Sequence, residues 1–491
     1  MIKYMIPRKR QFIPVLLAPL LLAGACAPTT NESTTEATDM EKRNHKSITI
    51  LHTNDMHGSY MPFRTTADNA TAQTGDAGRD TLITFGKEAE IGGFAYLASA
   101  IKKVREEKGA ENVLLLDGGD TFSDDQLGNL TKGEAMIRLM NTVKYDLMAL
   151  GNHDFDYGLE RTRELAKMAN FPMRAANIVD EQTQQPIFGA PYIITEKQGV
   201  KLTVLTLGYR NTPKTGNPDN VKGLRFSVGQ EVARQYVPKL REQADVVVVL
   251  SHEGTAVDYK MAREVEGIDL IIGAHSHDII EPRKKIGQTY VVQAMSDASV
   301  LGDTELILSG NKLVDVKDHY HWLWHEEWQL DPETQALVDE MRKPHLTKLQ
   351  EKVVESRDVI GRQYKSESPF DKLVGNLLLE GYKGEVAIMP GVGYGISFKP
   401  GPVTSEEVYK LLPHPSKIVT LQLTGSQLKQ TLEQAAKNLK PDNKLDAVGG
   451  LIQTTGIAYQ MDLTKPIGQR ISNMQIGNNP VSDGKTYKVV T

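Results

Sequence analysis

The amino-acid sequence predicts a layered α/β fold. Three observations predict it: five short apolar runs that each end abruptly in Asp, Asn, His or Gly residues, helical patterns between several of these runs, and the composition of a globular protein. In layered α/β domains, residues at the carboxyl ends of neighbouring strands meet in one crevice. The five runs are residues 47–57, 112–120, 145–154, 244–254 and 268–277.

The five runs are continuous in their apolar character, as in ADVVVVLSHEG at 244–254. Continuous apolar runs of this length are typical of strands that are buried on both faces. Between the runs, apolar residues recur at helical spacing. This spacing predicts helices over residues 92–108, 134–143, 159–169 and 228–243. Because strands alternate with helices, the pattern indicates a layered α/β domain.

Length and composition limit the class of protein. The chain has 491 residues, of which 40% are hydrophobic and 24% are charged, and its formal net charge is −5. At roughly 100–200 residues per domain, this length suggests about two to four domains. The composition argues against a disordered or multi-span membrane protein, and the negative charge gives no basis for nucleic-acid binding, which needs a basic surface. The single cysteine excludes an intrachain disulfide.

The N-terminus has the order of a secretory signal, with basic residues, then an apolar run, then small residues. The apolar run is short for a membrane span, so we expect residues 1–25 to be a signal peptide. The stretch LLAGAC resembles the lipobox of bacterial lipoproteins, which implies lipid attachment at Cys26. The simpler alternative is an ordinary signal cleaved near Ala25. Residues 26–46 are polar and are expected to form a tether, and loss of the signal changes the net charge from −5 to −9.

Side chains that bind metals stand at the ends of all five predicted strands. They are carboxylates, imidazoles and one amide, without thiolates, and such a set favours Zn, Mn or Fe over a structural zinc site. With one carboxylate shared, two four-ligand shells can be completed. The first is Asp55, His57, Asp120 and His277, and the second is Asp120, Asn152, His252 and His275. Two divalent ions about 3.5–4 Å apart suit phosphate-ester hydrolysis. Asp117 has a simpler interpretation as a turn residue.

Five motifs together resemble those of the calcineurin-like metallophosphoesterases, within them the exported 5'-nucleotidase and UDP-sugar hydrolase family. The motifs are TNDMH (53–57), DGGD (117–120), GNHD (151–154), SH (251–252) and GAHSH (273–277). The resemblance covers residues 48–308 and, more weakly, 366–491. It implies a four-layer α/β/β/α catalytic domain, a smaller α/β C-terminal domain, the same two ligand sets and attack by a metal-bound hydroxide. It also implies that His153, oriented by Asp156, faces the phosphoryl group.

Residues 366–491 are expected to recognise the substrate. In the family, an Asn-Gly-Gly-x-Arg segment contacts phosphate and two aromatic side chains sandwich the base. The corresponding segment here, residues 389–395, contains no Arg. Our candidate substrate-binding residues in it are Gly391, Gly393 and Tyr394. Leu451 stands where the first aromatic is expected, and the sequence ends at Thr491 before the segment that would carry the second. Two interpretations stay open: the second aromatic is absent, or the domain is truncated. Each missing stacking contact forfeits about 1–3 kcal/mol, which leaves strong nucleobase selection in doubt.

The patterns PGVGYG (390–395) and GGLIQTTG (449–456) are closer to those of SoxB-type thiosulfohydrolases, a branch of the same family that acts on a carrier protein. That branch departs from the pattern GNH-x-F-D, which this chain keeps at 151–156. The catalytic motifs therefore favour a phosphatase, whereas the recognition motifs do not clearly favour a nucleotide.

Residues 318–328 hold all three tryptophans and three of the twelve histidines. In a strand these histidines would share one face, but no carboxylate–glycine turn accompanies them. We therefore interpret the segment as a packing strand between domains. A helix is predicted from Pro332, capped by Asp331, to about Glu355. The expected division is a catalytic domain at 47–317, an inter-domain strand and helix at 318–365 and a recognition domain at 366–491.

The leading hypothesis is an exported two-metal phosphohydrolase of 5'-nucleotidase type, held at the membrane by its N-terminal lipid, in the periplasm or at the cell surface. Its expected substrate is a small phosphorylated molecule, such as a nucleotide. Two alternatives remain: a SoxB-like thiosulfohydrolase that acts on a sulfur carrier protein, and a non-catalytic surface binding protein.

Overall fold

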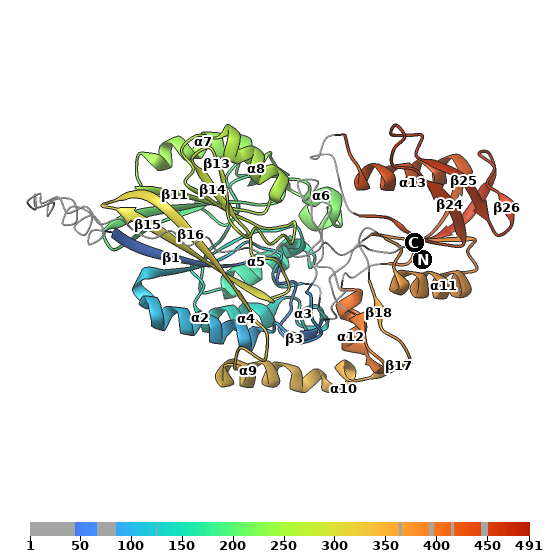
Figure 1. Cartoon of the computed structure of the whole chain (residues 1–491), viewed down its shortest axis with the longest axis horizontal. Coiled ribbons are helices and arrows are strands. Elements are labelled where there is room, and N and C mark those ends of the chain that lie inside the picture. The colour runs from blue at the N-terminus through green and yellow to red at the C-terminus, as the bar shows by residue number, and fades with distance from the viewer. Residues whose placement is uncertain are drawn as a thin grey trace, which may run out of the picture. The chain divides into compact units, whose positions relative to one another are not determined.

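The computed structural model describes residues 45–65, 85–123, 125–362, 366–391, 397–413, 417–442 and 450–491 (Figure 1). The expected signal peptide, Cys26, Gly393 and Tyr394 lie outside these ranges. The first strand, β1 (His45–Thr53), begins inside the segment that we expected to be a tether. The last two residues of the expected tether, His45 and Lys46, therefore belong to the folded domain.

The first sheet has six strands, and four of them run parallel to one another. In spatial order they are β16 (Lys312–Trp322), β15 (Val300–Ser309), β1, β4 (Val113–Asp117), β5 (Leu147–Ala149) and β6 (Met173–Arg174). β15 joins β1 in antiparallel register, and β16 joins β15 in the same way. β1 and β4 are parallel, so their carboxyl ends lie at the same edge of the sheet.

The second sheet also has six strands. In spatial order they are β13 (Lys284–Ile286), β14 (Thr289–Val292), β12 (Leu270–Gly273), β11 (Val246–Ser251), β9 (Val200–Leu207) and β8 (Tyr192–Lys197). The four central strands are parallel, and the two outer strands are antiparallel to their neighbours. The apolar residues of the four central strands are almost completely buried, and in β11 and β12 this agrees with the predicted apolar runs. Burying one such aliphatic side chain contributes about 1.5–3 kcal/mol.

The two sheets form the inner layers of a four-layer α/β/β/α domain, which confirms the expected fold class. One apolar core joins residues of both sheets, including Ile50 of β1 and Val248 of β11. The outer face of each sheet packs against helices. These helices are α2 (Phe94–Lys108), α4 (Glu134–Val143), α5 (Leu159–Met168) and α9 (Pro332–Arg342) on the first sheet, and α7 (Gly229–Arg241) and α8 (Thr255–Glu264) on the second.

The segment after the catalytic domain differs from the predicted pattern in two ways. Residues 318–322 pair with β15, so a domain boundary at residue 317 would divide β16, and this part of the segment packs within the first sheet. The helix does begin after Asp331, whose side chain accepts a hydrogen bond from the Thr334 N–H at 2.9 Å. It ends earlier than Glu355, because α9 is followed by a 3-10 turn, η4 (Lys343–His345), by α10 (Leu346–Leu349) and then by strand β17 (Lys352–Ser356).

The C-terminal residues form a smaller α/β structure. One sheet has the order β22 (Thr420–Thr424), β27 (Thr486–Val490), β19 (Val386–Met389) and β23 (Gln453–Thr455). Another contains β24 (Ile457–Met461), β25 (Ile471–Ile476) and β26 (Asn479–Pro480). Strand β17 pairs with β21 (Gly401–Thr404), and β18 (Ile360–Gly361) with β20 (Ser397–Phe398). The helices are α11 (Pro369–Tyr382), α12 (Ser405–Leu411) and α13 (Gly425–Leu439). Thr404 and Thr424 each begin a helix with a capping box.

Shorter elements complete the described chain. They are β2 (Phe63–Arg64), β3 (Glu90–Ile91), β7 (Ile178–Asp180), β10 (Leu224–Phe226), α3 (Gln126–Thr131), α6 (Thr212–Thr215), η1 (Ala110–Asn112), η2 (His153–Phe155) and η3 (Pro218–Val221).

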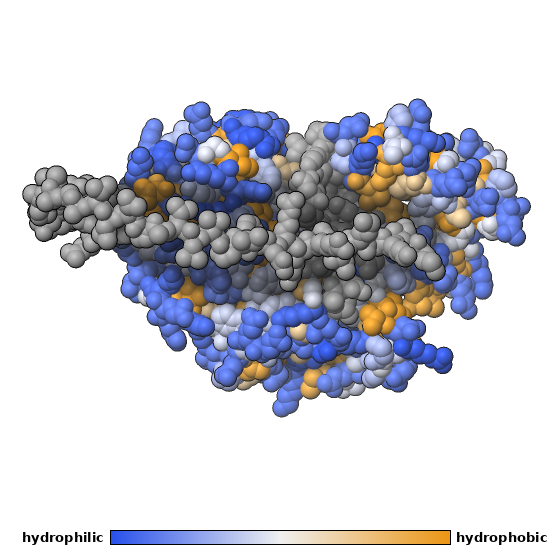
Figure 2. Space-filling model, in the orientation of Figure 1, coloured by the Kyte–Doolittle hydropathy of each residue, from blue (hydrophilic) through white to orange (hydrophobic). Residues whose placement is uncertain are grey.

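The visible surface is mainly hydrophilic, with scattered hydrophobic residues, several of them over the C-terminal elements (Figure 2). The exposed apolar side chains of the C-terminal part include Leu373, Leu377, Ile418, Val419 and Leu421. Within the described ranges, no helix combines the length and the apolar character needed to cross a membrane.

Candidate metal centre

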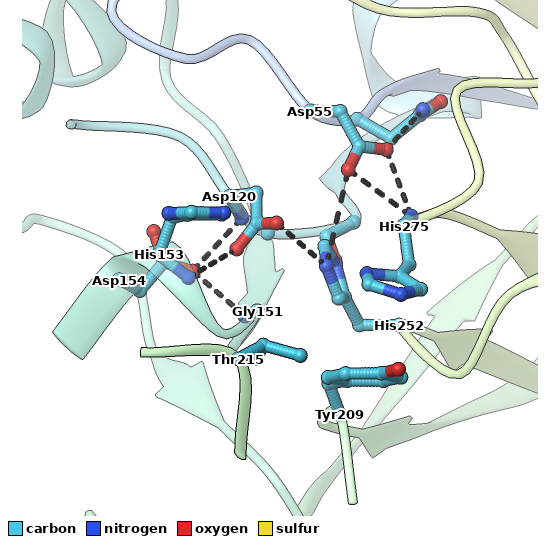
Figure 3. A network of polar contacts seen from close by, with 12 residues as sticks. Asp55, Asp120, Gly151, His153, Asp154, Tyr209, Thr215, His252 and His275 are labelled. Atoms are coloured by element: carbon cyan, nitrogen blue, oxygen red, sulfur yellow. Dashed lines mark hydrogen bonds and ion pairs between the residues drawn. The ribbon is translucent and has the colours of Figure 1, made fainter. Parts of the chain in front are cut away.

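Two clusters of potential metal ligands lie at the carboxyl ends of the parallel strands. Figure 3 shows Asp55 of one cluster and Asp120, His252 and His275 of the other. In each cluster, one ligand atom from every member lies within 4.8 Å of the others. The first cluster is Asp55, His57 and His277, and the second cluster is Asp120, His252 and His275. These six residues follow β1, β4, β11 and β12. The structure thus brings together side chains that are up to 222 positions apart in the sequence because neighbouring strands end at one edge.

Within each cluster, the potential metal-binding atoms lie close to one another. In the first cluster, the Nε2 atoms of His57 and His277 are 3.0 Å apart, and Asp55 Oδ1 is 3.4 Å from His277 Nε2. In the second cluster, His252 Nε2 is 3.0 Å from Asp120 Oδ2. The other ring nitrogen of His252, Nδ1, is 2.7 Å from the carbonyl oxygen of Gly118, which fixes the ring and leaves Nε2 directed at the carboxylate.

Asp55 and His275 connect the two clusters. The backbone N–H of His275 donates to both carboxylate oxygens of Asp55, at 3.1 and 2.9 Å. Asp55 Oδ1 is also 3.8 Å from His252 Nε2. The two clusters are therefore neighbouring parts of one site.

Five of the six cluster residues have left-handed backbone conformations. Their φ angles are 50° for Asp55, 47° for His57, 56° for Asp120, 72° for His275 and 53° for His277. This conformation costs a residue with a Cβ atom about 1–2 kcal/mol, and such strain persists where the surroundings fix it. The ends of β1, β4 and β12 are thus bent into turns that direct these side chains into the site.

Two glycines allow the turns to approach each other. A Cβ atom on Gly151 would lie 2.1 Å from Asp120 Oδ1, and one on Gly119 would lie 2.5 Å from the Gly151 nitrogen. Neither position has room for a side chain. The glycines of DGGD and GNHD are therefore required by close packing of the two turns.

Two buried aspartates stabilise these turns. Asp154 accepts hydrogen bonds from the backbone N–H groups of Asp120 (3.0 Å), Thr121 (2.9 Å) and Gly151 (2.8 Å). Asp117 accepts a hydrogen bond from the Thr53 hydroxyl at 2.6 Å and another from the Gly119 N–H at 3.0 Å. The sequence placed Asp154 at a strand end but did not reveal its role in joining the two turns.

The catalytic candidates His153 and Asp156 lie beside the second cluster. His153 Nδ1 is 2.8 Å from Asp156 Oδ2, and the His153 backbone N–H donates to Asp120 Oδ1 at 2.7 Å. The Ser123 hydroxyl also donates to Asp156, at 3.3 Å. The His153 ring stands edge to face with His57, with 5.4 Å between their centroids. Its side chain is 19% exposed, so the ring is accessible from solvent.

Asn152 precedes His153 and is buried. Its Oδ1 atom has no hydrogen-bond partner within the described residues. Leaving a buried amide oxygen without a partner costs about 1–3 kcal/mol, so such an atom needs a function. A cation beside Asp120 would satisfy it.

Burial and neighbouring charges set the protonation states of the potential ligands. Burial opposes the charge on Asp55, but His277 outweighs it and lowers the pKa of Asp55 to about 2. Burial lowers the pKa of His275 to about 3, which keeps it neutral. Burial also disfavours the charge on His252, whereas Asp120 favours it and raises the pKa of His252 to about 10. Metals bind ionised carboxylates and neutral imidazoles, and they replace protons such as the one on His252. The donor set therefore fits divalent metal ions.

Two family models match the chain. Residues 48–278 match the calcineurin-like phosphoesterase model, and residues 347–491 match the model of the 5'-nucleotidase C-terminal domain. The chain is a metallophosphoesterase of the 5'-nucleotidase family. It is therefore a metal-dependent phosphoric ester hydrolase, as the sequence motifs predicted.

Named relatives and solved structures agree with this assignment. The chain is 28% identical to protein UshA of Yersinia enterocolitica, over 92% of this chain and 85% of the relative. It is similar to the structure of the sulfate thiohydrolase SoxB of Thermus thermophilus, with a TM-score of 0.82, 25% identity and coverage of 90% and 88% of the two chains. The 5'-nucleotidase precursor of Thermus thermophilus gives a TM-score of 0.77, 25% identity and coverage of 91% and 89%.

The candidate substrate-binding segment is only partly described. Gly391 lies against Leu451, because a Cβ atom on Gly391 would lie 2.0 Å from the Leu451 carbonyl oxygen. Leu451 itself is buried. The described residues thus show Leu451 packed inside the C-terminal domain, where the family pattern would have an aromatic side chain for stacking.

Proposed function

We propose that this chain is an exported enzyme that uses two divalent metal ions to hydrolyse phosphate esters, with nucleotides as the expected substrate class. The observation that carries the proposal is the pair of three-residue clusters joined through Asp55 and His275. In this proposal, the first ion is held by Asp55, His57, His277 and Asp120. The second is held by Asp120, Asn152, His252 and His275. Zn, Mn and Fe all suit such a set.

Two bound cations would activate a water molecule and would neutralise charge on the phosphoryl oxygens. The protein supplies the geometry. Left-handed turns direct the ligands, the Gly118 carbonyl orients His252, and Asp154 fixes the two turns that carry Asp120 and Asn152. Because these contacts exist before any substrate binds, little reorganisation is needed during the reaction.

His153 is the proposed general acid or electrostatic stabiliser. Asp156 accepts the hydrogen on Nδ1, so Nε2 is the nitrogen that presents a proton to a phosphoryl oxygen or to the leaving group. An imidazolium held by a carboxylate stabilises the negative charge that develops there. The hydrogen bond from the His153 backbone to Asp120 ties this ring to the ligand set.

The test is a measurement of metal content and hydrolysis on the purified protein. We expect two metal ions per chain and release of phosphate from nucleoside monophosphates, UDP-glucose or an aryl phosphate. Chelation should abolish turnover, and Mn or Zn should restore it. Turnover that survives complete chelation would contradict the two-metal proposal. Substoichiometric metal together with no turnover on any substrate would favour a non-catalytic binding protein.

A second candidate is a thiosulfohydrolase that acts on a carrier protein. It is favoured by the likeness to the SoxB structure and by the buried Leu451 at the position of the expected base-stacking aromatic. The retained His153–Asp156 pair favours the phosphatase instead. The discriminating assay is release of sulfate from a peptide that carries a thiosulfonated cysteine. Sulfate release without phosphatase turnover would establish the second candidate.

We also propose that the mature protein is anchored outside the cytoplasm by a lipid on Cys26. Incorporation of a labelled fatty acid by the full-length protein, and its loss in Cys26→Ala, is the expected result. Equal labelling of both proteins would contradict the anchor.

A further inference from the structure

One aromatic residue beside the second cluster belongs to none of the metal-binding motifs. Tyr209 follows β9, the neighbour of β11 in the second sheet. Its ring stacks on the imidazole of His275, with 3.8 Å between the centroids and an interplanar angle of 27°. Figure 3 shows Tyr209 against His275 and near His252. The sequence contained a signal for this position, since KLTVLTLGY is a sixth apolar run that ends in glycine, but tyrosine is not among the usual metal ligands.

The backbone of Tyr209 is fixed from both sides. The buried side chain of Asn177 donates to the carbonyl oxygen of Gly208 and accepts from its N–H, both at 2.7 Å. A Cβ atom on Gly208 would lie 2.8 Å from the Leu150 carbonyl oxygen, so the turn is packed closely against the first sheet. The hydroxyl of Thr212 donates to the Tyr209 carbonyl at 2.7 Å. The ring is therefore held against His275 by a rigid turn.

His275 needs such support because its own backbone is strained. Its φ angle of 72° is the largest among the six cluster residues. The two hydrogen bonds to Asp55 fix its backbone N–H but do not fix the rotation of its ring. Stacking on Tyr209 limits this rotation. Fixing the orientation of a ligand in advance raises metal affinity, because less conformational freedom is lost when the metal binds.

The geometry points to Tyr209 as a positioning residue for His275 that sets the affinity of the second metal position. This inference rests on the proposed function, because it assumes that His275 binds a metal ion. Tyr209 acts through the face of its ring. The aromatic face is therefore required, whereas the hydroxyl group is not required for the stack.

Metal titration of the apoprotein tests the inference. The protein is stripped with a chelator, dialysed and titrated with Mn²⁺, and free Mn²⁺ is measured by electron paramagnetic resonance. The wild type should show two sites. Tyr209→Leu should weaken one of them by about 10–100-fold, the usual effect of removing a residue that supports a metal ligand. Tyr209→Phe keeps the ring and should bind both ions as the wild type does.

Tyr192→Leu is the matched control. Tyr192 lies on β8 of the same sheet, and its ring makes an edge-to-face contact with Tyr236, with 6.3 Å between the centroids. The Tyr192→Leu variant therefore loses an aromatic contact that involves neither cluster. Both Mn²⁺ affinities should remain unchanged in this variant. Far-UV circular dichroism of each variant identifies any folding defect. If Tyr209→Leu does not fold, Tyr209→Met, which fills a similar volume without a planar ring, is measured instead.

The outcomes separate the inference from the proposed function. Two unchanged Mn²⁺ affinities in Tyr209→Leu or Tyr209→Met would overturn the inference and leave the two-metal proposal intact. Equal weakening in Tyr209→Phe and Tyr209→Leu would also overturn it, because the hydroxyl rather than the ring face would then be responsible. Fewer than two sites in the wild-type protein would overturn the proposed function itself, and the inference with it.

Discussion

The chain contains two histidine-rich regions that use this residue differently. In the two metal-ligand clusters, each histidine follows a parallel strand, and three of the four, His57, His275 and His277, have positive φ angles in the turns after β1 and β12. In residues 318–328, which we call the tryptophan ribbon, His319 and His321 lie inside the regular strand β16. There the imidazoles contact each other, with 4.5 Å between ring centroids, and His321 contacts Trp328. Within the described residues, neither ligand cluster includes a histidine of the ribbon.

The difference lies in the backbone. A regular strand sends alternate side chains to one face at fixed spacing, so neighbouring imidazoles there pack on a sheet surface. A left-handed turn at a strand end directs side chains from several strands toward one point. Strand-end turns rich in Asp and Gly therefore identify the metal centre better than the number of histidines does.

The largest expected effect is a loss of turnover on substitution of His153 in the metal centre. His153→Ala should lower kcat by about 10²–10⁴-fold, the usual contribution of a positioned general acid or base. Its metal content should remain at the wild-type value, because His153 is not in either ligand cluster. Steady-state kinetics on an aryl phosphate and elemental analysis measure the two quantities. His319→Ala, in the ribbon, is the matched control and should leave kcat unchanged. A His153→Ala enzyme with nearly wild-type kcat would remove the proposed role of this residue.

The next expected effect concerns His52, on the ribbon side of the first sheet. Protonation of His52 should lower the stability of the folded protein. His52 is completely buried in β1, and its Nε2 is 3.2 Å from the Thr304 hydroxyl. Burial lowers its pKa from 6.5 to about 4, although Asp303 and Asp318 act in the opposite direction. The unfolded chain therefore binds a proton more readily than the folded chain does. Stability should be full above about pH 6.5 and should fall toward pH 4, by about 3 kcal/mol in total from this residue.

Urea unfolding of metal-free protein between pH 7.5 and 4.5 measures this effect. Other groups also titrate in this range, so the wild type is compared with His52→Gln, which cannot gain the charge. The free energy of unfolding of the variant should decrease less as the pH falls. Parallel pH profiles for the two proteins would show that His52 is not the group responsible.

The sequence predicted the chemistry of the site better than its surroundings. The residues of DGGD and GNHD mark strand ends by local pattern alone, so Asp120 and Asn152 could be found without knowing which strands are neighbours. Strand β16 pairs with β15 through contacts that local periodicity does not encode, so the sequence did not reveal that residues 318–322 of the ribbon belong to the first sheet. Val353 fits the helical pattern that was predicted to continue to about Glu355, but it lies in β17, because pairing of this segment with β21 decides its conformation. Tyr209 was missed because its role depends on a ring contact between two strands.

Two glycines allow a direct comparison of packing in the two regions. A Cβ atom on Gly151 would meet Asp120 in the metal centre, and one on Gly302 would lie 2.2 Å from Cε1 of His52 beside the ribbon. Overpacking of this kind costs about 1–3 kcal/mol. Gly151→Ala should also weaken Mn²⁺ binding, because it displaces the Asp120 carboxylate. Gly302→Ala should lower the melting temperature and leave Mn²⁺ affinity unchanged. Loss of Mn²⁺ affinity in Gly302→Ala would show that the two regions are coupled through β1.

The smallest expected effect concerns the last histidine of the ribbon. His325 stacks on Tyr96 of α2, with 3.7 Å between ring centroids, and its Nε2 is 3.1 Å from the Gly92 carbonyl oxygen. His325→Ala should lower the free energy of unfolding by about 0.5–1.5 kcal/mol, the value of an aromatic pair, without changing kcat or metal content. His325→Phe keeps the ring and loses the polar contact, so recovery of stability in this variant assigns the effect to stacking. If His325→Ala instead lost metal, a ligand would lie in the ribbon, and strand-end turns would not be sufficient to identify the metal centre.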